Sequence, residues 1–471
     1  MKKTKIICSI GPASEKVEVM QELVLNGMNC ARINLSHASR TSILNTIEII
    51  REVRKSTSLP VAIMYDTKGP EFRTLEIIND GISLKRGDTI KLEKRIMRGN
   101  KDSFSVNHPE ALDKINIGNH VLVDNALLDL EVIDKHYDYL VLKALNDGEI
   151  KSHKTINVPG INLELPFISE TDRADIIFAA EHSCDYLALS FVNSKEDVLE
   201  AREIVEEANG DARIIAKIES KAGIDNIDEI IAVSDGIMIA RGDLGVEVPM
   251  EDIPILQKEI IKKCRENSKF AIVATEMLAS MYTSPRPTRA EVSDVANAVL
   301  DGTDCVMLSG ETTVGRYPVQ AVSYMSRICK RIESTIDYSK YIEYIDTKNI
   351  SSTIAKLVAD AVNYNDIKAV VVTTISGYTA RTISNLRPNC PILACCPSNH
   401  IAEKVELNFG VESIVTRMYD TTDEMIKDAR DMAIKKYNLK PNNLIIVTAG
   451  LPLGKATETN FIQIVKISNK K

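Results

Sequence analysis

The stretch 213–241 reads RIIAKIESKAGIDNIDEIIAVSDGIMIAR, and its pattern decides the fold. Two apolar runs, Arg213 to Glu219 and Gly236 to Arg241, enclose an amphipathic run from Gly223 to Val233. A buried strand, a helix and a second buried strand form the unit from which parallel sheets are built. The stretch therefore predicts one βα repeat of a parallel sheet.

The same alternation runs through most of the first 334 residues. Eight strand-like runs lie at Lys5 to Ser9, Cys30 to Leu35, Val61 to Asp66, Tyr186 to Phe191, Arg213 to Glu219, Gly236 to Arg241, Phe270 to Thr275 and Cys305 to Ser309. A helical pattern follows all but the third directly, at Lys16 to Asn26, Arg40 to Lys55, Lys195 to Ala208, Gly223 to Val233, Met250 to Asn267, Thr288 to Asp301 and Pro318 to Ser334. The helix after the third run is postponed to Ser169 to His182. Eight such units predict a (β/α)8 TIM barrel over residues 1–70 and 165–343.

An inserted domain is expected where that helix is delayed, over residues 71–164. Turn signals such as Asn79-Asp80-Gly81 separate short strands there, which predicts a small β-barrel. Because the insert follows a barrel strand, it should cover the active-site end as a lid. From residue 344 to 471 helices and strands alternate again, and this segment predicts a separate open α/β domain.

Composition and charge narrow the class of protein. The 471 residues are 44% hydrophobic and 26% charged, which excludes a disordered or fibrous chain, and 58 basic against 66 acidic residues leave a net charge of −8. That balance offers no basic surface for nucleic acid or for an anionic membrane. No apolar run approaches the roughly 20 residues that cross a bilayer, and no signal sequence precedes Gly11-Pro12, so a cytoplasmic protein is expected.

Nine cysteines lie mostly within apolar runs, and none forms a Cys-x-x-Cys pair. They are interpreted as reduced core residues of a cytosolic protein. The adjacent Cys395 and Cys396 leave two interpretations open, a redox-active pair or ordinary strand packing.

Polar residues gather where the predicted barrel strands end, which is where barrel enzymes keep their active sites. Lys217 and Glu219 share one strand face, because strand side chains alternate. A lone pair of this kind on a strand is more often a structural ion pair. Asp243, just beyond the next strand, adds a second carboxylate, and two carboxylates with room for water and substrate oxygens suit Mg²⁺. All seven histidines lie elsewhere, which argues against zinc.

The second and third strands supply a further polar set. Arg32, Asn34 and Ser36 alternate along one strand, and Asp66 and Thr67 end the next. One carboxylate with several neutral oxygens suits a monovalent cation. An inner layer of barrel hydrogen bonds would use the same residues, and this alternative stays open.

Two cations, Arg32 and Lys217, are expected to be unpaired in this tight site. A phosphoryl group between them resolves that imbalance, and phosphoryl transfer needs positioning and charge neutralisation more than covalent chemistry. Neither the phosphate-binding loop GxxxxGK[ST] nor a kinase-type GxGxxG is present. The chain is therefore expected to be a phosphoryl-transfer enzyme outside those two classes.

A hydroxyl-rich loop, Thr374 to Thr379 (TISGYT), joins a strand to a helix in the C-terminal domain. Its backbone amides are suited to hold a phosphate, with Thr374, Ser376, Gly377 and Thr379 as the binding residues. An ordinary Ser/Thr turn with a helix cap explains the same residues.

Several segments together resemble the pyruvate kinase family over nearly the full length. They are Thr4 to Ser14 (TKIICSIGPAS), Gly27 to His37 (GMNCARINLSH), Asp66 to Arg73 (DTKGPEFR), Ile214 to Glu219 (IIAKIE), Ser234 to Gly245 (SDGIMIARGDLG) and Pro285 to Glu311 (PRPTRAE to MLSGE). The resemblance implies phosphoryl transfer from phosphoenolpyruvate to ADP, giving pyruvate and ATP in the last step of glycolysis. It also implies Mg²⁺ (or Mn²⁺) and K⁺ as cofactors and a homotetramer. Activation by a sugar phosphate at the C-terminal loop is a further hypothesis.

The resemblance assigns roles to single residues. Lys217 would neutralise charge on the transferring group with help from Arg32, and Thr275 would lie near the enolate carbon that is protonated afterwards. The binding residues would be Arg32, Lys217, Thr275 and the amides of Gly242 and Asp243 for the substrate, Glu219 and Asp243 for the divalent metal, Asn34, Ser36, Asp66 and the Thr67 carbonyl for K⁺, and His37, Arg73 and Lys154 for the nucleotide. Glu71 matches the K⁺-dependent form of the family.

Three positions depart from the family pattern. Glu276 adds a carboxylate beside Thr275, Val123 to Leu127 (VDNAL) replaces a DDGL pattern in the lid, and Phe191-Val192-Asn193 lacks the Arg that commonly follows. Two other functions stay open. One is a Mg²⁺-dependent aldolase of enolpyruvate or 2-oxoacid chemistry, and the other is a nucleotide- or sugar-phosphate-binding regulator that has lost turnover.

Overall fold

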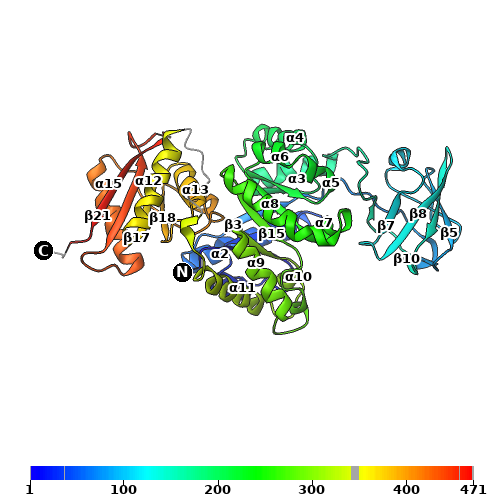
Figure 1. The fold of residues 1–471 in the computed structure, drawn as a ribbon, viewed down its shortest axis with the longest axis horizontal. Helices are drawn as coiled ribbons and strands as arrows, with labels where there is room; N and C mark the ends of the chain where they lie inside the picture. Colours follow the sequence, from blue (N-terminus) through cyan, green and yellow to red (C-terminus); the bar gives the residue numbers. More distant parts are fainter. Residues whose placement is uncertain (1, 37, 341–348, 456, 469–471) are drawn as a thin grey trace.

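A computed structural model describes residues 2–36, 38–340, 349–455 and 457–468. Eight parallel strands close into a barrel in the order β1-β16-β15-β14-β13-β12-β3-β2, which confirms the predicted barrel. These strands are β1 (Lys5–Ser9), β2 (Cys30–Asn34), β3 (Ala62–Asp66), β12 (Tyr186–Leu189), β13 (Arg213–Ile218), β14 (Gly236–Ala240), β15 (Phe270–Ala274) and β16 (Cys305–Leu308). The barrel lies in the middle of the molecule, between the insert and the C-terminal domain (Figure 1).

Helices surround the barrel and begin where the sequence supplies caps. Ser169, Ser194 and Thr288 each form a capping box. The capping side chain accepts the backbone N–H three residues on, and the side chain of that residue accepts the backbone N–H of the capping residue. The predicted helix over 223–233 is split in two, because Asn226 ends one helix and starts the next. The helices of this layer are α1 (Val17–Asn26), α2 (Arg40–Thr57), α3 (Glu170–Glu181), α4 (Lys195–Glu207), α5 (Lys221–Asp225), α6 (Ile227–Val233), α7 (Arg241–Glu247), α8 (Ile253–Glu266), α9 (Arg289–Asp301), α10 (Gly310–Thr313) and α11 (Pro318–Glu333).

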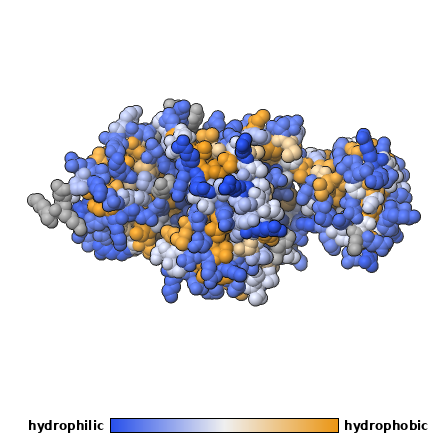
Figure 2. Space-filling view, turned by 90° about the horizontal axis from the view of Figure 1, so that it is seen from below, coloured by the Kyte–Doolittle hydropathy of each residue, from blue (hydrophilic) through white to orange (hydrophobic). Residues whose placement is uncertain are grey.

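The insert between β3 and α3 is a β-domain with its own apolar core. Its strands form two ladders, of six strands (β11-β7-β8-β9-β5-β6) and two strands (β10-β4), and not one closed ring of hydrogen bonds. The space-filling view shows it joined to the barrel through a narrow neck (Figure 2). The strands are β4 (Ile82–Leu84), β5 (Thr89–Glu93), β6 (Ser103–Ser105), β7 (His120–Val123), β8 (Leu128–Lys135), β9 (Tyr139–Ala144), β10 (Gly148–Ile150) and β11 (Ile156–Asn157).

The C-terminal domain is an open α/β sheet of order β19-β18-β17-β20-β21, parallel except for its last strand. Helices α12 to α14 share one core with the sheet, and α15 covers the other face. Its elements are α12 (Ile350–Tyr364), β17 (Ile367–Thr373), α13 (Tyr378–Asn385), β18 (Ile392–Cys396), α14 (Asn399–Lys404), β19 (Val411–Val415), α15 (Thr422–Tyr437), β20 (Leu444–Gly450) and β21 (Thr459–Lys466).

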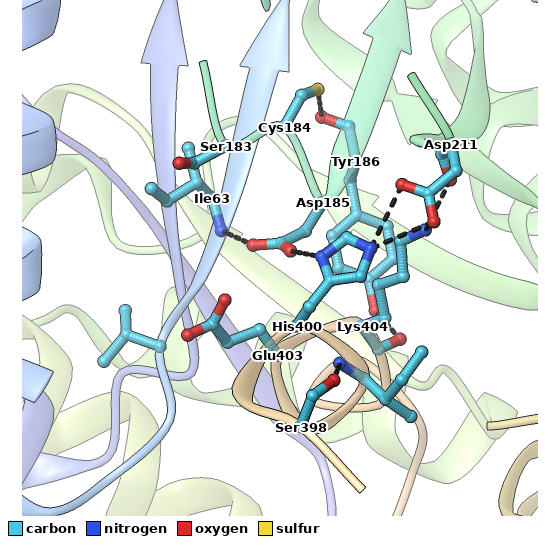
Figure 3. Close-up of polar contacts among 12 residues, drawn as sticks. Ile63, Ser183, Cys184, Asp185, Tyr186, Asp211, Ser398, His400, Glu403 and Lys404 are labelled. Atoms are coloured by element: carbon cyan, nitrogen blue, oxygen red, sulfur yellow. Dashed lines mark hydrogen bonds and ion pairs between the residues drawn. The ribbon is translucent and has the colours of Figure 1, made fainter. Parts of the chain in front are cut away.

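The C-terminal domain closes the floor of the barrel, at the amino ends of its strands. Leu407 belongs to the same buried cluster as the inward-facing barrel residues Tyr186 and Phe270. The Tyr186 hydroxyl donates to the Lys404 carbonyl at 2.6 Å. In the same domain contact, α14 places His400 beside two barrel carboxylates. Its Nε2 is 2.9 Å from Asp211 and its Nδ1 is 4.0 Å from Asp185 (Figure 3).

All nine cysteines are buried and unpaired, which confirms the core interpretation. Cys395 and Cys396 belong to the cores on opposite faces of the C-terminal sheet, so their adjacency reflects strand packing. Burial raises the pKa of the Cys395 thiol to about 12, which removes its reactivity at neutral pH. Within the described residues, no helix is both long and apolar enough to cross a membrane.

Candidate active site

Lys217 stands at the centre of the polar cluster at the carboxyl ends of the barrel strands. Its ammonium is 3.0 Å from Asp66 Oδ1, 3.1 Å from Glu219 Oε1 and 2.7 Å from Ser190 Oγ. The contacts with Asp66 and Ser190 are hydrogen bonds, and the contact with Glu219 is an ion pair. Burial opposes its charge, but Asp66 and Glu219 outweigh burial and raise the pKa of Lys217. The lysine is therefore held charged and in one orientation.

Arg32 lies beside it and is also paired. Its Nε donates to Asp66 Oδ2 at 2.5 Å, and its NH1 donates to Ser9 Oγ at 2.7 Å. Burial alone would disfavour ionised Asp66, but Arg32 and Lys217 together lower the pKa of that carboxyl. The expectation of two unpaired cations is therefore wrong. The sequence did not reveal that Asp66, at the end of β3, reaches both of them.

Glu219 and Asp243 approach one another from successive strand ends. Glu219 Oε2 accepts the Phe191 amide at 2.7 Å, and Asp243 lies in the first turn of α7. Burial raises the pKa of Glu219 to about 7; Lys217 opposes this rise, while Asp243 and Asp66 add to it. Two crowded carboxylates fit a divalent cation, which would offset their repulsion.

No group of three or more His, Cys, Asp or Glu side chains in the described part of the chain forms a metal cluster. A cation at Glu219 and Asp243 would therefore need further oxygens from water or substrate. Mg²⁺ is typically bound in this way, through one or two carboxylates together with water and phosphate oxygens.

The four oxygen-bearing residues expected at the monovalent site come from paired strands, since Asn34 of β2 is in register with Asp66 of β3. Ser36 lies two residues on, and its amide donates to Asn34 Oδ1 at 3.0 Å. The Thr67 carbonyl accepts the Ser190 hydroxyl at 2.8 Å. One carboxylate among neutral oxygens fits a large monovalent cation.

Thr275 has a left-handed backbone, with φ of 68°, and the following Glu276 has φ of 56°. This conformation is strained for a β-branched residue and is typical of functional sites. The Thr275 hydroxyl donates to the Ala274 carbonyl and accepts the Gly242 amide at 2.7 Å. Gly242 N–H, expected to face substrate, is therefore engaged by Thr275 here. The Glu276 side chain is exposed.

Arg241 holds this strained turn. It donates to the Thr275 carbonyl at 2.9 Å and forms a two-pronged pair with Asp294 of α9 at 2.7 Å. A bidentate pair of this kind fixes orientation as well as charge.

Arg73, one of the residues expected at the nucleotide, lies where the insert meets the barrel. A cleft of about 400 Å³ there is bordered by Arg73, Asn125 and Asp243, among others. Arg73 donates to the His153 carbonyl at 2.7 Å and to Glu71 at 2.5 Å, and Lys154 pairs with Asp124 at 3.0 Å. His37 lies outside the described residues.

The departure at 123–127 has a structural signature. Asp124, Asn125 and Ala126 all have positive φ, between 53° and 61°. This left-handed run forms the connection between β7 and β8, and its Asp124 is the partner of Lys154.

The C-terminal loop borders a separate pocket of about 390 Å³. Thr374, Ser376 and Thr379 line it together with Lys455 and Gly454 from the loop after β20. The Gly377 amide donates to Thr374 Oγ1 at 3.0 Å, so the loop does contain a Ser/Thr turn, and Gly377 has φ of 82°. The turn and a ligand pocket are therefore compatible.

Two contributing residues were missed from the sequence. Ser190 directly follows β12, and applying the strand-end rule to that strand would have found it. Asp294 lies in the middle of α9 and carries no local signal, because only the packing of α9 on the barrel brings it to Arg241.

A closed parallel barrel with cations, carboxylates and an oxygen-rich cluster at its carboxyl end defines a barrel enzyme of the phosphoryl-transfer type. Comparison with known proteins specifies the family. Residues 1–322 match the family model "Pyruvate kinase, barrel domain", and residues 352–465 match "Pyruvate kinase, alpha/beta domain". The chain belongs to the pyruvate kinase family and is a phosphotransferase.

Individual relatives agree over nearly the whole chain. A pyruvate kinase of Geobacillus stearothermophilus is 42% identical over 99% of this chain and 81% of its own length. One of Clostridium perfringens is 41% identical over 99% of this chain and all of its own. A solved pyruvate kinase structure from Cryptosporidium parvum superposes with a TM-score of 0.94 at 38% identity, covering 99% of this chain and 96% of its own.

Proposed function

We propose that the enzyme transfers the phosphoryl group of phosphoenolpyruvate to ADP, giving pyruvate and ATP, with Lys217 as the central catalytic cation. The observation that carries this proposal is the buried Lys217 ammonium, paired with both Asp66 and Glu219, with Arg32 also bonded to Asp66. A preorganised cation in a water-poor site stabilises charge that develops on a transferring phosphoryl group.

The reaction breaks the bond between phosphorus and the enol oxygen and forms one to a terminal ADP oxygen. Lys217 and Arg32 act on the phosphoryl oxygens and lower the barrier by charge neutralisation. The remaining enolate gains a proton at carbon, and Thr275, held in its strained turn by Arg241, orients groups near that carbon. The amides of Gly242 and Asp243 are assigned to the substrate carboxylate, which would replace Thr275 Oγ1 as the acceptor of the Gly242 amide.

Glu219 and Asp243 would hold Mg²⁺ or Mn²⁺, and Asn34, Ser36, Asp66 and the Thr67 carbonyl would hold K⁺. When bound, these cations neutralise phosphate and enolate charge. Arg73 and Lys154, with His37, are assigned to the nucleotide, and the assignment of Arg73 is supported by the cleft that it lines between insert and barrel.

The decisive experiment measures pyruvate formation from phosphoenolpyruvate and ADP, with Mg²⁺ and K⁺ each present or omitted. Turnover is expected only with both ions, and the Glu219→Ala variant should lose it. Folded protein without turnover under any condition would contradict the proposal. Binding of ADP without turnover would identify a regulator, and cleavage of a 2-oxoacid would identify an aldolase.

Regulation by a sugar phosphate at the C-terminal pocket is a second part of the proposal. Thr374, Ser376, Gly377 and Thr379 would bind the phosphate, supported by the pocket that Thr374, Ser376 and Thr379 share with Lys455. A sugar bisphosphate should lower the half-saturating phosphoenolpyruvate concentration, and Ser376→Asp should abolish that effect. Identical saturation curves across a panel of sugar mono- and bisphosphates would reject it.

We further propose three domains with limits at 1–70 with 165–343, 71–164 and 344–471, supported by separate apolar cores. A homotetramer is supported by an exposed stripe on α12, where Ile350, Leu357 and Tyr364 recur every seven residues and remain at least half exposed. Light scattering of the purified chain tests this assembly. The nine buried, unpaired thiols support a cytoplasmic location.

A further inference from the structure

Ser190 is buried at the centre of the catalytic cluster, where its side chain bonds to two residues of the candidate monovalent-cation site, Asp66 and Thr67, and to Lys217. Its hydroxyl oxygen accepts the Lys217 ammonium at 2.7 Å, the shortest of that ammonium's three contacts. The hydroxyl hydrogen faces the Thr67 carbonyl at 2.8 Å and Asp66 Oδ1 at 3.2 Å. Only 3% of the residue is exposed.

The three acceptors around Lys217 are not equivalent. Asp66 and Glu219 are carboxylates, and each is also assigned to a cation, K⁺ in one case and the divalent metal in the other. A carboxylate that turns toward a metal ion gives up part of its bond to a neighbouring ammonium. Ser190 is the neutral acceptor among the three, and its hydroxyl is not needed by either cation.

From this difference we infer that Ser190 is the positioning residue for Lys217 in the metal-loaded enzyme, an inference that rests on the proposed function. A neutral acceptor holds the ammonium without cancelling its positive charge. The full charge is then directed at the phosphoryl group, where it is most useful.

The surroundings of Ser190 fix it for this task. Its backbone amide donates to Thr67 Oγ1 at 3.2 Å, so both its main chain and its side chain are bonded to the end of β3. Gly69 packs against it, and a Cβ at Gly69 would lie 2.8 Å from the Ser190 carbonyl oxygen and 2.9 Å from its Cβ. Gly69 also has φ of 73°, so glycine is required there for two reasons.

The test compares Ser190→Ala with a matched control, Ser234→Ala. Ser234 is equally buried in the same barrel, and its hydroxyl donates one 2.7 Å bond to the Ile230 carbonyl at the opposite end. With Mg²⁺ and K⁺ saturating, Ser190→Ala should lower kcat by about 10- to 100-fold while KM for phosphoenolpyruvate changes less than about threefold. Ser234→Ala should leave both constants unchanged.

A second readout reports Lys217 directly. Trinitrobenzenesulfonate, a lysine-directed reagent, is applied to full-length protein with Mg²⁺ and K⁺ but without substrate, and the Lys217 peptide is quantified by mass spectrometry. Labelling should be several-fold faster in Ser190→Ala than in the wild type or in Ser234→Ala. Ser190→Cys, which keeps the volume but offers a weak acceptor, should behave like Ser190→Ala and guards against a folding defect.

Wild-type turnover is measured first, so that failure of the proposed function is recognised separately. If the wild type is active and Ser190→Ala retains its kcat, the inference is wrong. It is equally wrong if kcat falls but the Lys217 labelling rate stays at the wild-type value, because the residue would then act on something other than the lysine.

Discussion

Ionic clusters lie at both ends of this barrel, and they have different roles. At the carboxyl end Lys217, Asp66 and Arg32 bond to one another where the barrel strands end. At the amino end Asp185 and Asp211 of the barrel meet His400 of the C-terminal domain (Figure 3). The first cluster can exchange protein partners for substrate and cations, whereas the second is completed by α14. The same chemistry therefore serves reaction at one end and domain docking at the other.

Removing a charge from the carboxyl end of the barrel, here called the upper end, should affect turnover most. Lys217→Met should lower kcat by roughly a thousandfold, about 4 kcal/mol, with a much smaller change in substrate binding, because the cation acts mainly in the transition state. Steady-state kinetics and substrate titration separate the two effects. A variant with near-normal kcat would contradict the role of Lys217 as the central catalytic cation.

Removing a charge from the amino end of the barrel, the floor, should affect stability instead. Arg387 is 2% exposed, pairs with Asp304 of the barrel at 2.9 Å and donates to the Gly302 carbonyl at 2.8 Å. Arg387→Met leaves Asp304 buried without its cation and should cost about 3 kcal/mol in denaturant unfolding. The folded variant should keep the wild-type kcat.

The control for this variant is an exposed pair in the insert. Lys85 and Asp147 are 2.9 Å apart, but their side chains are 78% and 60% exposed. Lys85→Met should leave the free energy of unfolding nearly unchanged, because water screens an exposed ion pair. Equal losses in the two variants would show that burial of the floor pair is unimportant.

The floor should also respond to pH. Burial, reinforced by Glu403 and opposed by Arg54, raises the pKa of Asp185 to about 7. A raised pKa means that the native state favours the protonated carboxyl. The contribution of this group to the free energy of unfolding is therefore fully present below about pH 4, and it is lost as the pH rises through 7. His400, Lys404 and Asp211 complete the charged surroundings (Figure 3).

Asp185→Asn imitates the protonated carboxyl and retains an oxygen for the Ile63 amide, now 2.8 Å away. At pH 8 it should be more stable than the wild type by at least about 2 kcal/mol, and this advantage should shrink toward pH 5. Thermal unfolding of both proteins across this range measures it. A constant difference would mean that Asp185 does not titrate in the native state.

The smallest effect is expected at Glu276. Its side chain is exposed although it follows the strained Thr275. Glu276→Gln should change kcat/KM by less than about fivefold, equivalent to less than about 1 kcal/mol. A larger change at low ionic strength would place its charge within reach of the substrate.

The upper end was more predictable from the sequence than the floor. Strand periodicity gave the barrel, and the alternation in Lys217-Ile218-Glu219 correctly placed two charges on one face. The bonds from Asp66 to both Arg32 and Lys217 were not predictable, because side-chain reach across strands depends on register.

The floor escaped prediction for a related reason. Asp185 and His400 are more than 200 residues apart, and neither belongs to a local pattern. The insertion of Leu407 into the barrel cluster is likewise set by domain packing. Local periodicity predicts elements, but contacts between domains need the assembled structure.

Leu407 couples the folding of the barrel to the folding of the C-terminal domain. The cluster it completes contains residues from all eight barrel strands, from Ile7 of β1 to Met307 of β16, yet Leu407 itself is made about a hundred residues after the last of them. A ribosome-bound chain that ends at the barrel would therefore have an open apolar floor. The apolar floor is covered only when α14 and the turn after it have been synthesised. The barrel is the domain that begins at the N-terminus, and its core is therefore completed by the domain that is synthesised last.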